Sequence, residues 1–447
     1  MDETSEPPPL NRDPAFYGMT ATQFLGAFND NLFKQLMLLL AIPIGAAAAT
    51  EQDQQGLATI LFSLPFIIFS GYAGYLSDRF SKRRIIVAAK VAEIAVMLLG
   101  AAAFLLYGHV GYTGLLVVLF LMGMQSSFFG PGKYGVLPEM LREADLPRAN
   151  GIILMTTFLA IILGTASAGI LGQVFVNEDL PLTDSASGLW IGSAMCVAVA
   201  VAGTLTSLLI RRVPAAQPKL EFGLSSLVVP PDARRTLSND RPLVMALLAG
   251  SMFWMVGGIT IPSVNSLGMV QLEAGKLGTS ILTAIIGLGI ASGAVVAGRL
   301  CHGKADFRIV RVGLWGMVLS LCVLCISSPG GVHLLGFWGS LPLLVVLGVS
   351  AGFFAIPVQV FIQTRPPAEQ KGRLIAVMNQ FNFVAILLSG LIYTLFDRLI
   401  DLWGWPRSCL FGMMAILVLP LAIGYRPRNE GLIVAPASDA KTVDRGD

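Results

Sequence analysis

Charged residues are scarce in this chain. Asp, Glu, Lys and Arg make up only 13% of its 447 residues, whereas soluble domains carry about 25%. Hydrophobic residues make up 55% and the mean hydropathy is +0.73. Apolar runs of about 20 residues, long enough to cross ~30 Å of hydrocarbon as a helix, recur from the first helix almost to the end. The composition therefore excludes a soluble protein and predicts a polytopic membrane protein.

Cysteine and histidine are also rare. The five cysteines fall in or beside apolar runs, and Cys322 and Cys325 have no companion ligands, so we interpret this pair as apolar packing. His109, His302 and His333 are too scattered for a metal site or a catalytic triad. None is followed five residues later by Asp, so the H-x-x-x-x-D motif of membrane acyltransferases is absent. We expect no enzyme activity, no metal and no resident cofactor.

We predict an all-α polytopic membrane protein with twelve transmembrane helices. A bilayer demands that each backbone N–H and C=O group be paired within its own segment, which favours helices. The first 14 residues are polar and Pro-rich, so no cleavable signal peptide is expected. The predicted spans are 16–41, 56–77, 84–107, 113–131, 150–175, 187–211, 242–264, 279–300, 309–328, 337–360, 373–396 and 404–425.

The loops between these spans alternate in charge. One set is rich in Lys and Arg, whereas the opposite loops hold only Lys276, Arg398 and Arg407. The positive-inside rule then places both termini in the cytoplasm. The net charge is only +3, which gives no reason to expect a nucleic-acid partner.

Similar words 225 residues apart indicate two homologous halves. "GMQSSFFGPGKYG" aligns with "GVSAGFFAIPVQV", and "FLAIILG" with "FVAILLS". A repeat in the same orientation predicts two bundles with the binding site between them. The expected division is a cytoplasmic tail (1–15), a six-helix bundle (16–211), a cytoplasmic linker (212–241), a second six-helix bundle (242–425) and a cytoplasmic tail (426–447).

The first span contains the stretch "TQFLGAFNDNLFKQ", which carries Asn29, Asp30, Asn31 and Lys34. A charge at the centre of a membrane helix costs at least ~2.5–3.5 kcal/mol on insertion scales. Asp30 and Lys34 are i,i+4 neighbours, so a local ion pair would lower that cost. Because burying a pair rarely adds net stability, we favour residues that line a polar cavity, with the local pair as the alternative.

Further polar and aromatic residues lie in neighbouring spans. Lys90 could equally be a residue that reaches the membrane surface, and Lys133 an interface anchor. We predict that the substrate or a coupling ion is bound by Asn29, Asp30, Asn31, Lys34, Lys90, Glu93, Gln125 and Lys133. Phe24, Phe28, Met124, Phe128 and Phe129 are the candidates for an apolar groove that holds an acyl chain, although aromatic residues in a membrane protein with 25 phenylalanines are usually packing residues. Asn150, Thr156, Thr157, Asn379, Gln380 and Asn382 either line the same path or bond neighbouring helices.

The loop "GYLSDRFSKRR" after the second span resembles the G-x-L-x-D-R-x-x-[KR]-[KR] signature of the major facilitator superfamily. Glycine would allow helices to approach closely, and the carboxylate and basic cluster would form a cytoplasmic gate that breaks when the bundles rock. The alternative is a plain positive-inside anchor. The predicted gate residues are Gly74, Asp78, Arg79 and Arg83. The second-half counterpart has His302 where Asp78 would align, so a symmetric second gate is not expected.

Four longer words, "TQFLGAFNDNLFK", "QSSFFGPGKYGVLPE", "TTFLAIILG" and "QTRPPAEQKGRLIAVMNQFN", resemble bacterial lysophospholipid transporters over about residues 16–425. The chain is similar to the membrane portion of versions fused to an acyltransferase and acyl carrier protein synthetase. The resemblance implies that Asp30 and Lys133 belong to the functional polar set. Some relatives place an arginine in the seventh span, whereas "FWMVGGITIPSVN" has none and Ile261 lies near that position.

The resemblance implies a transporter in the bacterial inner membrane that moves lysophospholipids toward the cytoplasmic leaflet by alternating access. A cytoplasmic acyltransferase that reacylates the product is the expected partner. Asp30 would orient a lysine, or receive an amine headgroup or a coupling cation, either a proton or sodium. The alternative is a proton-coupled exporter of a drug, siderophore or other amphipathic metabolite, with Asp30 as the coupling carboxylate.

Overall fold

The computed structural model describes residues 8–43, 52–142, 145–176, 186–219, 235, 237–301, 306–328, 330–365 and 371–425. A helix is found in each predicted span. The first half contains α1 (Pro14–Leu40), α2 (Gln55–Arg79), α3 (Lys82–Leu105), α4 (Tyr107–Met140), α5 (Leu146–Phe175) and α7 (Trp190–Ser207). The second half contains α9 (Arg241–Ser266), α10 (Gly275–Cys301), α11 (Phe307–Leu324), α12 (Gly336–Thr364), α13 (Lys371–Trp403) and α14 (Cys409–Gly424). A short π-helix, η6 (Leu267–Gln271), continues α9.

Ten of these helices are long and apolar enough to cross a membrane. The all-helical membrane fold is thereby confirmed. The other two are α14, which is apolar but only 16 residues long, and α1, which carries the polar stretch around Asp30. That these two also cross the membrane, and that the termini are cytoplasmic, stay predictions.

Helix α4 differs most from its predicted range of 113–131. Gly111 has φ +57°, a conformation that glycine adopts without the penalty of a Cβ, and it interrupts the helix near the predicted start. At the other end the helix continues through Pro131 and Pro138 to Met140. Proline in a membrane helix is tolerated where neighbouring groups satisfy the freed carbonyl, so "GPG" does not end the span as expected.

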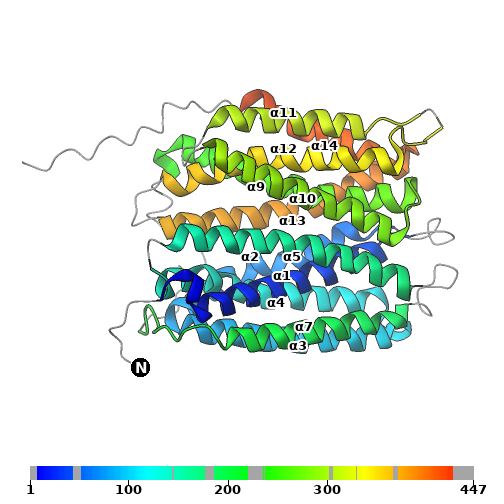
Figure 1. Cartoon of the computed structure of the whole chain (residues 1–447). Helices are drawn as coiled ribbons and strands as arrows, with labels where there is room; N and C mark the ends of the chain where they lie inside the picture. The colour runs from blue at the N-terminus through cyan, green and yellow to red at the C-terminus, as the bar shows by residue number, and fades with distance from the viewer. Residues whose placement is uncertain are drawn as a thin grey trace, which may run out of the picture.

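The long helices run roughly parallel, with the first six (blue to green) on one side and the last six (green to red) on the other (Figure 1). Across the middle, α5 packs on α10 and α2 packs on α13, while α1 and α2 also contact α9. The largest core cluster draws its buried residues from Ala246 to Tyr425, and the next from Leu32 to Cys196. This packing supports the predicted division into two bundles.

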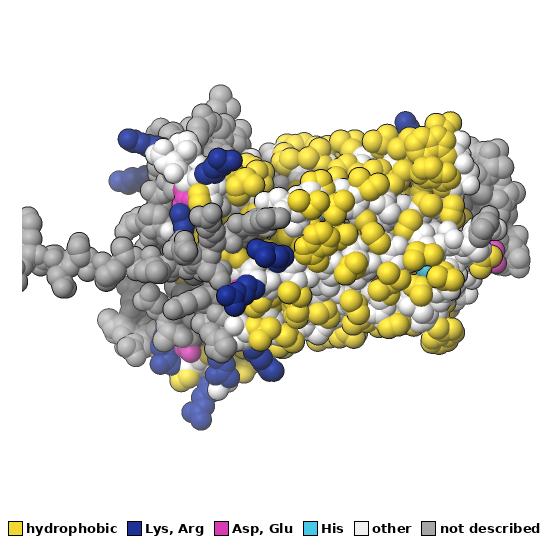
Figure 2. Space-filling view, turned by 90° about the horizontal axis from the view of Figure 1, so that it is seen from above, with side chains coloured by type: hydrophobic (Ala, Val, Ile, Leu, Met, Phe, Trp, Pro, Cys, Tyr) yellow, Lys and Arg dark blue, Asp and Glu magenta, His cyan; other side chains and the backbone are white. Residues whose placement is uncertain are grey.

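Lys and Arg side chains gather at one end of the molecule, beside a belt of apolar side chains (Figure 2). We call this the basic end; Arg79, Lys82, Arg83 and Arg211 belong to it. The opposite end, here the far end, contains the loop before α2, the η6 segment and Arg407. The positive-inside rule predicts that the far end faces away from the cytoplasm.

Helix α1 is attached to its own half at both ends. At the basic end Asp13 is fully buried, caps the helix by accepting from the Ala15 N–H (2.9 Å), and pairs with Arg211 (3.1 Å). Near the far end the Tyr112 hydroxyl of α4 donates to the Met37 carbonyl (2.9 Å). Helix α1 therefore moves with the first bundle.

Candidate substrate-binding site

Asp30 faces α4 from the middle of α1. Its Oδ2 accepts a hydrogen bond from the Ser126 hydroxyl (2.9 Å), and Ser126 in turn accepts from the Gln125 amide (2.8 Å). The other carboxylate oxygen, Oδ1, has no hydrogen-bond partner among the described residues. A buried acceptor without a partner costs free energy unless a ligand or water supplies a donor. Oδ1 of Asp30 can therefore accept a hydrogen bond from a bound ligand while Ser126 holds Oδ2.

Lys34 lies one turn further along α1, but it does not pair with Asp30 within 4 Å in the part of the chain that the structure describes. The alternative of a local ion pair is thus not realised. Its ammonium instead lies over the Phe62 ring of α2, 5.1 Å from the ring centroid. Both Asp30 and Lys34 are partly exposed. The two charges therefore face different helices, Asp30 facing α4 and Lys34 facing α2.

Lys90 and Glu93 form a tight ion pair on α3, and each side chain is only 2% exposed. Asn29 donates to the second Glu93 oxygen (2.9 Å) and to the Cys196 carbonyl (2.9 Å). The Lys90 ammonium also lies 5.3 Å from the Phe129 ring centroid. Lys90 is therefore not at the membrane surface, and this group forms a neutral, hydrogen-bonded wall beside Asp30.

The charges around Asp30 leave a net positive site. Lys34, Lys90, Lys133 and Glu93 all interact electrostatically with the Asp30 carboxylate. By formal charge, the three lysines against Asp30 and Glu93 sum to +1. Lys133 is buried, with 7% of its surface exposed. Asn31 does not join the cluster, because its amide donates to the Ala27 carbonyl of its own helix (2.7 Å).

The predicted apolar groove divides into separate groups. Phe24 and Phe28 stack along α1, with ring centroids 6.5 Å apart. Phe128 contacts two rings of α2, Phe69 (6.0 Å) and Tyr72 (6.2 Å), whereas Phe129 lies under Lys90 as described above. Met124, Phe128 and Phe129 are partly exposed. The α2–α4 aromatic cluster is therefore the best candidate to receive an acyl chain.

The predicted gate is not assembled in this conformation. Asp78 is exposed and its carboxylate forms no ion pair among the described residues. Arg79 donates to Tyr75 of its own helix, and Arg83 donates to the Leu208 carbonyl (2.6 Å). The ion pair of this loop joins Lys82 to Glu139 instead.

Gly74 also departs from its expected role. A Cβ built on this glycine would meet no atom of the described residues within 4 Å, so none of the described helices packs closely against it.

Several other polar residues bond neighbouring helices. The Gln23 amide of α1 donates to the Thr157 hydroxyl of α5 (2.9 Å), and Asn382 of α13 bonds the Ser251 hydroxyl of α9 (3.2 Å). Thr156 bonds carbonyls of its own helix, and the side chain of Asn150 lies outside the described residues. These contacts indicate that the residues hold helices together rather than line the substrate path.

Sequence reasoning missed two amides in apolar segments. Gln35, next to Lys34, donates to Asn265 of the second half (2.9 Å), and both are buried. The signal was present: an amide inside a membrane helix needs a partner, as Asn29 does.

Comparisons with known proteins agree with this fold. The family model described as Major Facilitator Superfamily matches residues 19–390. The lysophospholipid transporter LplT of Enterobacter sp. (strain 638) is 28% identical over 390 residues, which cover 84% of this chain and 87% of the relative. LplT of an Escherichia coli strain is 28% identical over 411 residues, covering 90% of each chain.

Solved transporter structures share the architecture. A POT family transporter in complex with a thioalcohol-conjugated peptide has a TM-score of 0.69 at 13% identity, covering 91% of this chain and 94% of that one. A D-xylose–proton symporter has a TM-score of 0.67 at 14% identity, covering 93% and 99%. At such identities the likeness concerns the fold alone. Because the family model matches most of its residues, this chain belongs to the major facilitator superfamily, within which it is similar to LplT lysophospholipid transporters.

Proposed function

We propose that this multi-pass protein of the bacterial inner membrane moves lysophospholipids by alternating access and binds their headgroups between α1 and α4. One observation carries the proposal. Asp30 and Lys34 lie one turn apart on α1, do not pair with one another, and are both partly exposed. A lysophospholipid headgroup brings an anionic phosphate, and in zwitterionic forms an amine as well. The relatives named lysophospholipid transporters support the same assignment.

Lys34 is the residue that binds the phosphate. It has an aromatic face on one side and no carboxylate on the other, so a phosphate oxygen can accept its N–H groups. A hydrogen bond to a charged group contributes about 1.5–3 kcal/mol, or about 10- to 150-fold in affinity. Lys133 adds positive charge to the same region.

Asp30 binds the cationic partner. Its Oδ1 lacks a donor while Ser126 holds Oδ2 in place. An ethanolamine ammonium would satisfy this oxygen, and so would a coupling proton or sodium ion when the headgroup carries no amine. The neutral group of Lys90, Glu93 and Asn29 fixes the wall behind it.

The acyl chain lies against the α2–α4 aromatic cluster of Phe69, Tyr72 and Phe128. These rings are partly exposed, so an apolar chain can cover them and gain ~25 cal/mol per Å² of surface removed from water. Transport runs toward the cytoplasmic leaflet, where a cytoplasmic acyltransferase consumes the product.

The test is uptake of labelled lysophosphatidylethanolamine by the purified protein in vesicles. Lys34→Met should lower the apparent affinity by about 10- to 150-fold, whereas Lys34→Arg, which keeps the charge, should retain most of it. Lys219→Met is the matched control, because Lys219 is an exposed lysine in the connection between the halves.

Uptake no faster than in protein-free vesicles would overturn the function, and an unchanged Lys34→Met variant would overturn the site. A polyaromatic cation that is transported while lysolipid is not would identify the protein as an exporter instead.

A further inference from the structure

Asn265, near the far end of α9, is a buried contact point between the two halves. Its Oδ1 accepts from the Gln35 amide of α1 (2.9 Å) and from the Thr283 hydroxyl of α10 (2.9 Å). Its Nδ2 donates to the side-chain oxygen Oε1 of Gln55 on α2 (3.0 Å). Asn265 and Gln55 are both 0% exposed. One side chain thus hydrogen-bonds to two helices of the first half and one of the second.

The network continues from Gln55 to the second contact between the halves, where α2 packs on α13. The Gln55 amide donates to the Tyr393 hydroxyl of α13 (3.0 Å) and to Asp53 Oδ2 (2.9 Å), and Tyr393 donates to the same Asp53 oxygen (2.7 Å). We call Gln35, Asn265, Thr283, Gln55, Tyr393 and Asp53 the far-end clasp.

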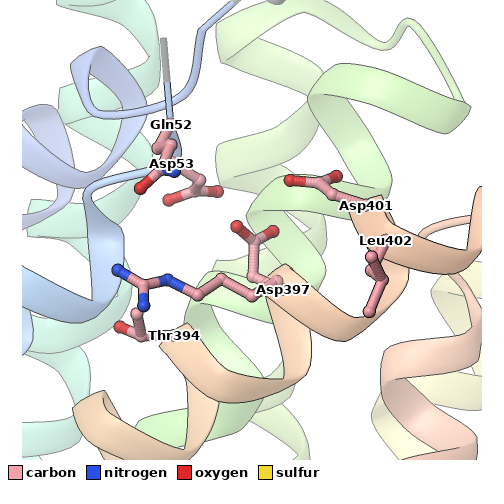
Figure 3. A pocket seen from close by; sticks show the side chains of 7 residues that line it. Gln52, Asp53, Thr394, Asp397, Asp401 and Leu402 are labelled. Atoms are coloured by element: carbon pink, nitrogen blue, oxygen red, sulfur yellow. The ribbon is translucent and has the colours of Figure 1, made fainter.

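A cavity of about 270 Å³ lies beside Asp53 at the far end, away from Asp30. Carboxylates of Asp53, Asp397 and Asp401 point toward it from the two halves (Figure 3). Arg407 pairs with Asp397 and Asp401 at its edge. Water can therefore reach the outer side of the clasp, whereas Asn265 on its inner side is fully buried.

Close packing around the clasp shows that the far end is closed. A Cβ on Gly169 of α5 would lie 2.4 Å from Ser280 Cβ of α10. A Cβ on Gly172 would lie 3.3 Å from the Cβ of Lys276, also on α10. By contrast, the Asp78 carboxylate at the basic end is exposed. The hydrogen bonds of the clasp must break whenever the far end opens.

We propose that Asn265 is the centre of a gate, with uncharged partners in Gln35, Gln55 and Thr283, which holds the far end closed and must open for a substrate to enter from that side. This inference rests on the proposed function in one respect: alternating access requires the two ends of the protein to open in turn. A bond between amides gains little long-range attraction, so it forms only when the halves are already in contact and is little affected by salt. Loss of one side chain at the centre removes three of its bonds at once.

The experiment measures opening without any lipid. Leu39 is 1% exposed and packs with Ile42 and with Met269 of the other half, outside the clasp. In a variant without native cysteines, Leu39→Cys reports far-end opening by its rate of reaction with a water-soluble maleimide in nanodiscs. Asn265→Ala should raise that rate about tenfold, which corresponds to ~1.4 kcal/mol.

Gln271→Ala is the matched control. Gln271 lies at the same end, and its amide bonds the Gly331 carbonyl (2.8 Å) and the Ser408 N–H (2.7 Å), both within the second half. Its loss removes a comparable amide without touching the clasp. The control should stay within about twofold of the parent rate. An unchanged rate in Asn265→Ala, or an equal rise in Gln271→Ala, would overturn the proposal.

A second measurement covers the case in which Asn265→Ala does not fold. Gly172→Cys with Lys276→Cys places two Cβ atoms 3.3 Å apart, close to the ~3.5–4.5 Å of a disulfide, so oxidation should link the halves rapidly. Gln35→Leu, which removes a different member of the clasp, should slow that cross-link several-fold. Equal cross-linking with and without Gln35 would contradict the gate. Neither readout depends on lysolipid, so failure of the proposed substrate would leave both results interpretable.

Discussion

The buried pair of Lys90 and Glu93 allows a quantitative test of which charges are structural. Each side chain is 2% exposed, so neutralising one leaves the other without compensation. Breaking a buried pair in this way costs ~3–5 kcal/mol. In Glu93→Gln the amide oxygen can still accept from Asn29, so the loss is that of the charge rather than of the hydrogen bond.

The expected effect on melting follows from that energy. A domain of 150–250 residues loses about 2–4 °C per kcal/mol, so Glu93→Gln and Lys90→Gln should each lower Tm by about 6–20 °C. The double variant, in which both charges are absent, should recover most of the loss, because a buried pair adds little beyond a neutral replacement. The coupling energy should exceed ~2 kcal/mol.

The assay is thermal unfolding of the purified protein in detergent, followed by size-exclusion chromatography, together with lysolipid uptake. Coupling below ~1 kcal/mol, with the double variant as unstable as the sum of the singles, would refute the assignment of a structural pair. A double variant that is stable but binds no lysolipid would show that Lys90 or Glu93 touches the substrate directly.

Three further predictions can be tested with the labelling, unfolding and uptake assays described above. Burial raises the pKa of Asp53, although hydrogen bonds from Gln55 and Tyr393 act in the opposite direction. Asp53 therefore binds a proton more tightly when the far end is closed, so acidification should favour the closed state. Leu39→Cys labelling should then slow at low pH relative to an Asp53→Asn variant at the same pH. A Gly26→Ala methyl would lie 2.5 Å from the Lys90 ammonium, so this change should cost about 1–3 kcal/mol in thermal unfolding, and an unchanged Tm would contradict the packing. Asp78→Ala should leave stability within ~0.5 kcal/mol, because the side chain is exposed, while reducing lysolipid uptake if Asp78 closes the basic end; full uptake would exclude that gate.

Sequence alone gave the positions of the helices well, because the bilayer imposes length and apolar composition on each span. Most observed boundaries lie within a few residues of the predicted ones. The largest errors lie at the ends of two helices. Pro131 and Pro138 do not end α4, and α13 runs to Trp403 rather than 396.

The site residues stay a prediction, and the structure changes the pairing expected among them. Polar residues in the first span marked α1 correctly as unusual, yet the i,i+4 spacing could not reveal that Asp30 bonds Ser126 while Lys34 contacts Phe62. Side-chain partners depend on which helices are neighbours. Gln35 and Asn265 lie 230 positions apart, so no local pattern could join them.

Helix α1 carries residues of both the headgroup site and the far-end clasp. Asp30 and Gln35 are five residues apart, about 7.5 Å along the axis, and Lys34 directly precedes Gln35. The helix is fastened to its bundle at Asp13 and Met37, so it cannot adjust alone to an occupant. Axial shifts of about 1–2 Å are common between helices in such transitions. The Gln35–Asn265 bond is 2.9 Å long, and a shift of about 1 Å along the direction of this bond would lengthen it past the limit of a hydrogen bond. A movement of the first bundle on binding would thus reach the Gln35–Asn265 bond through α1 and weaken the closure of the far end.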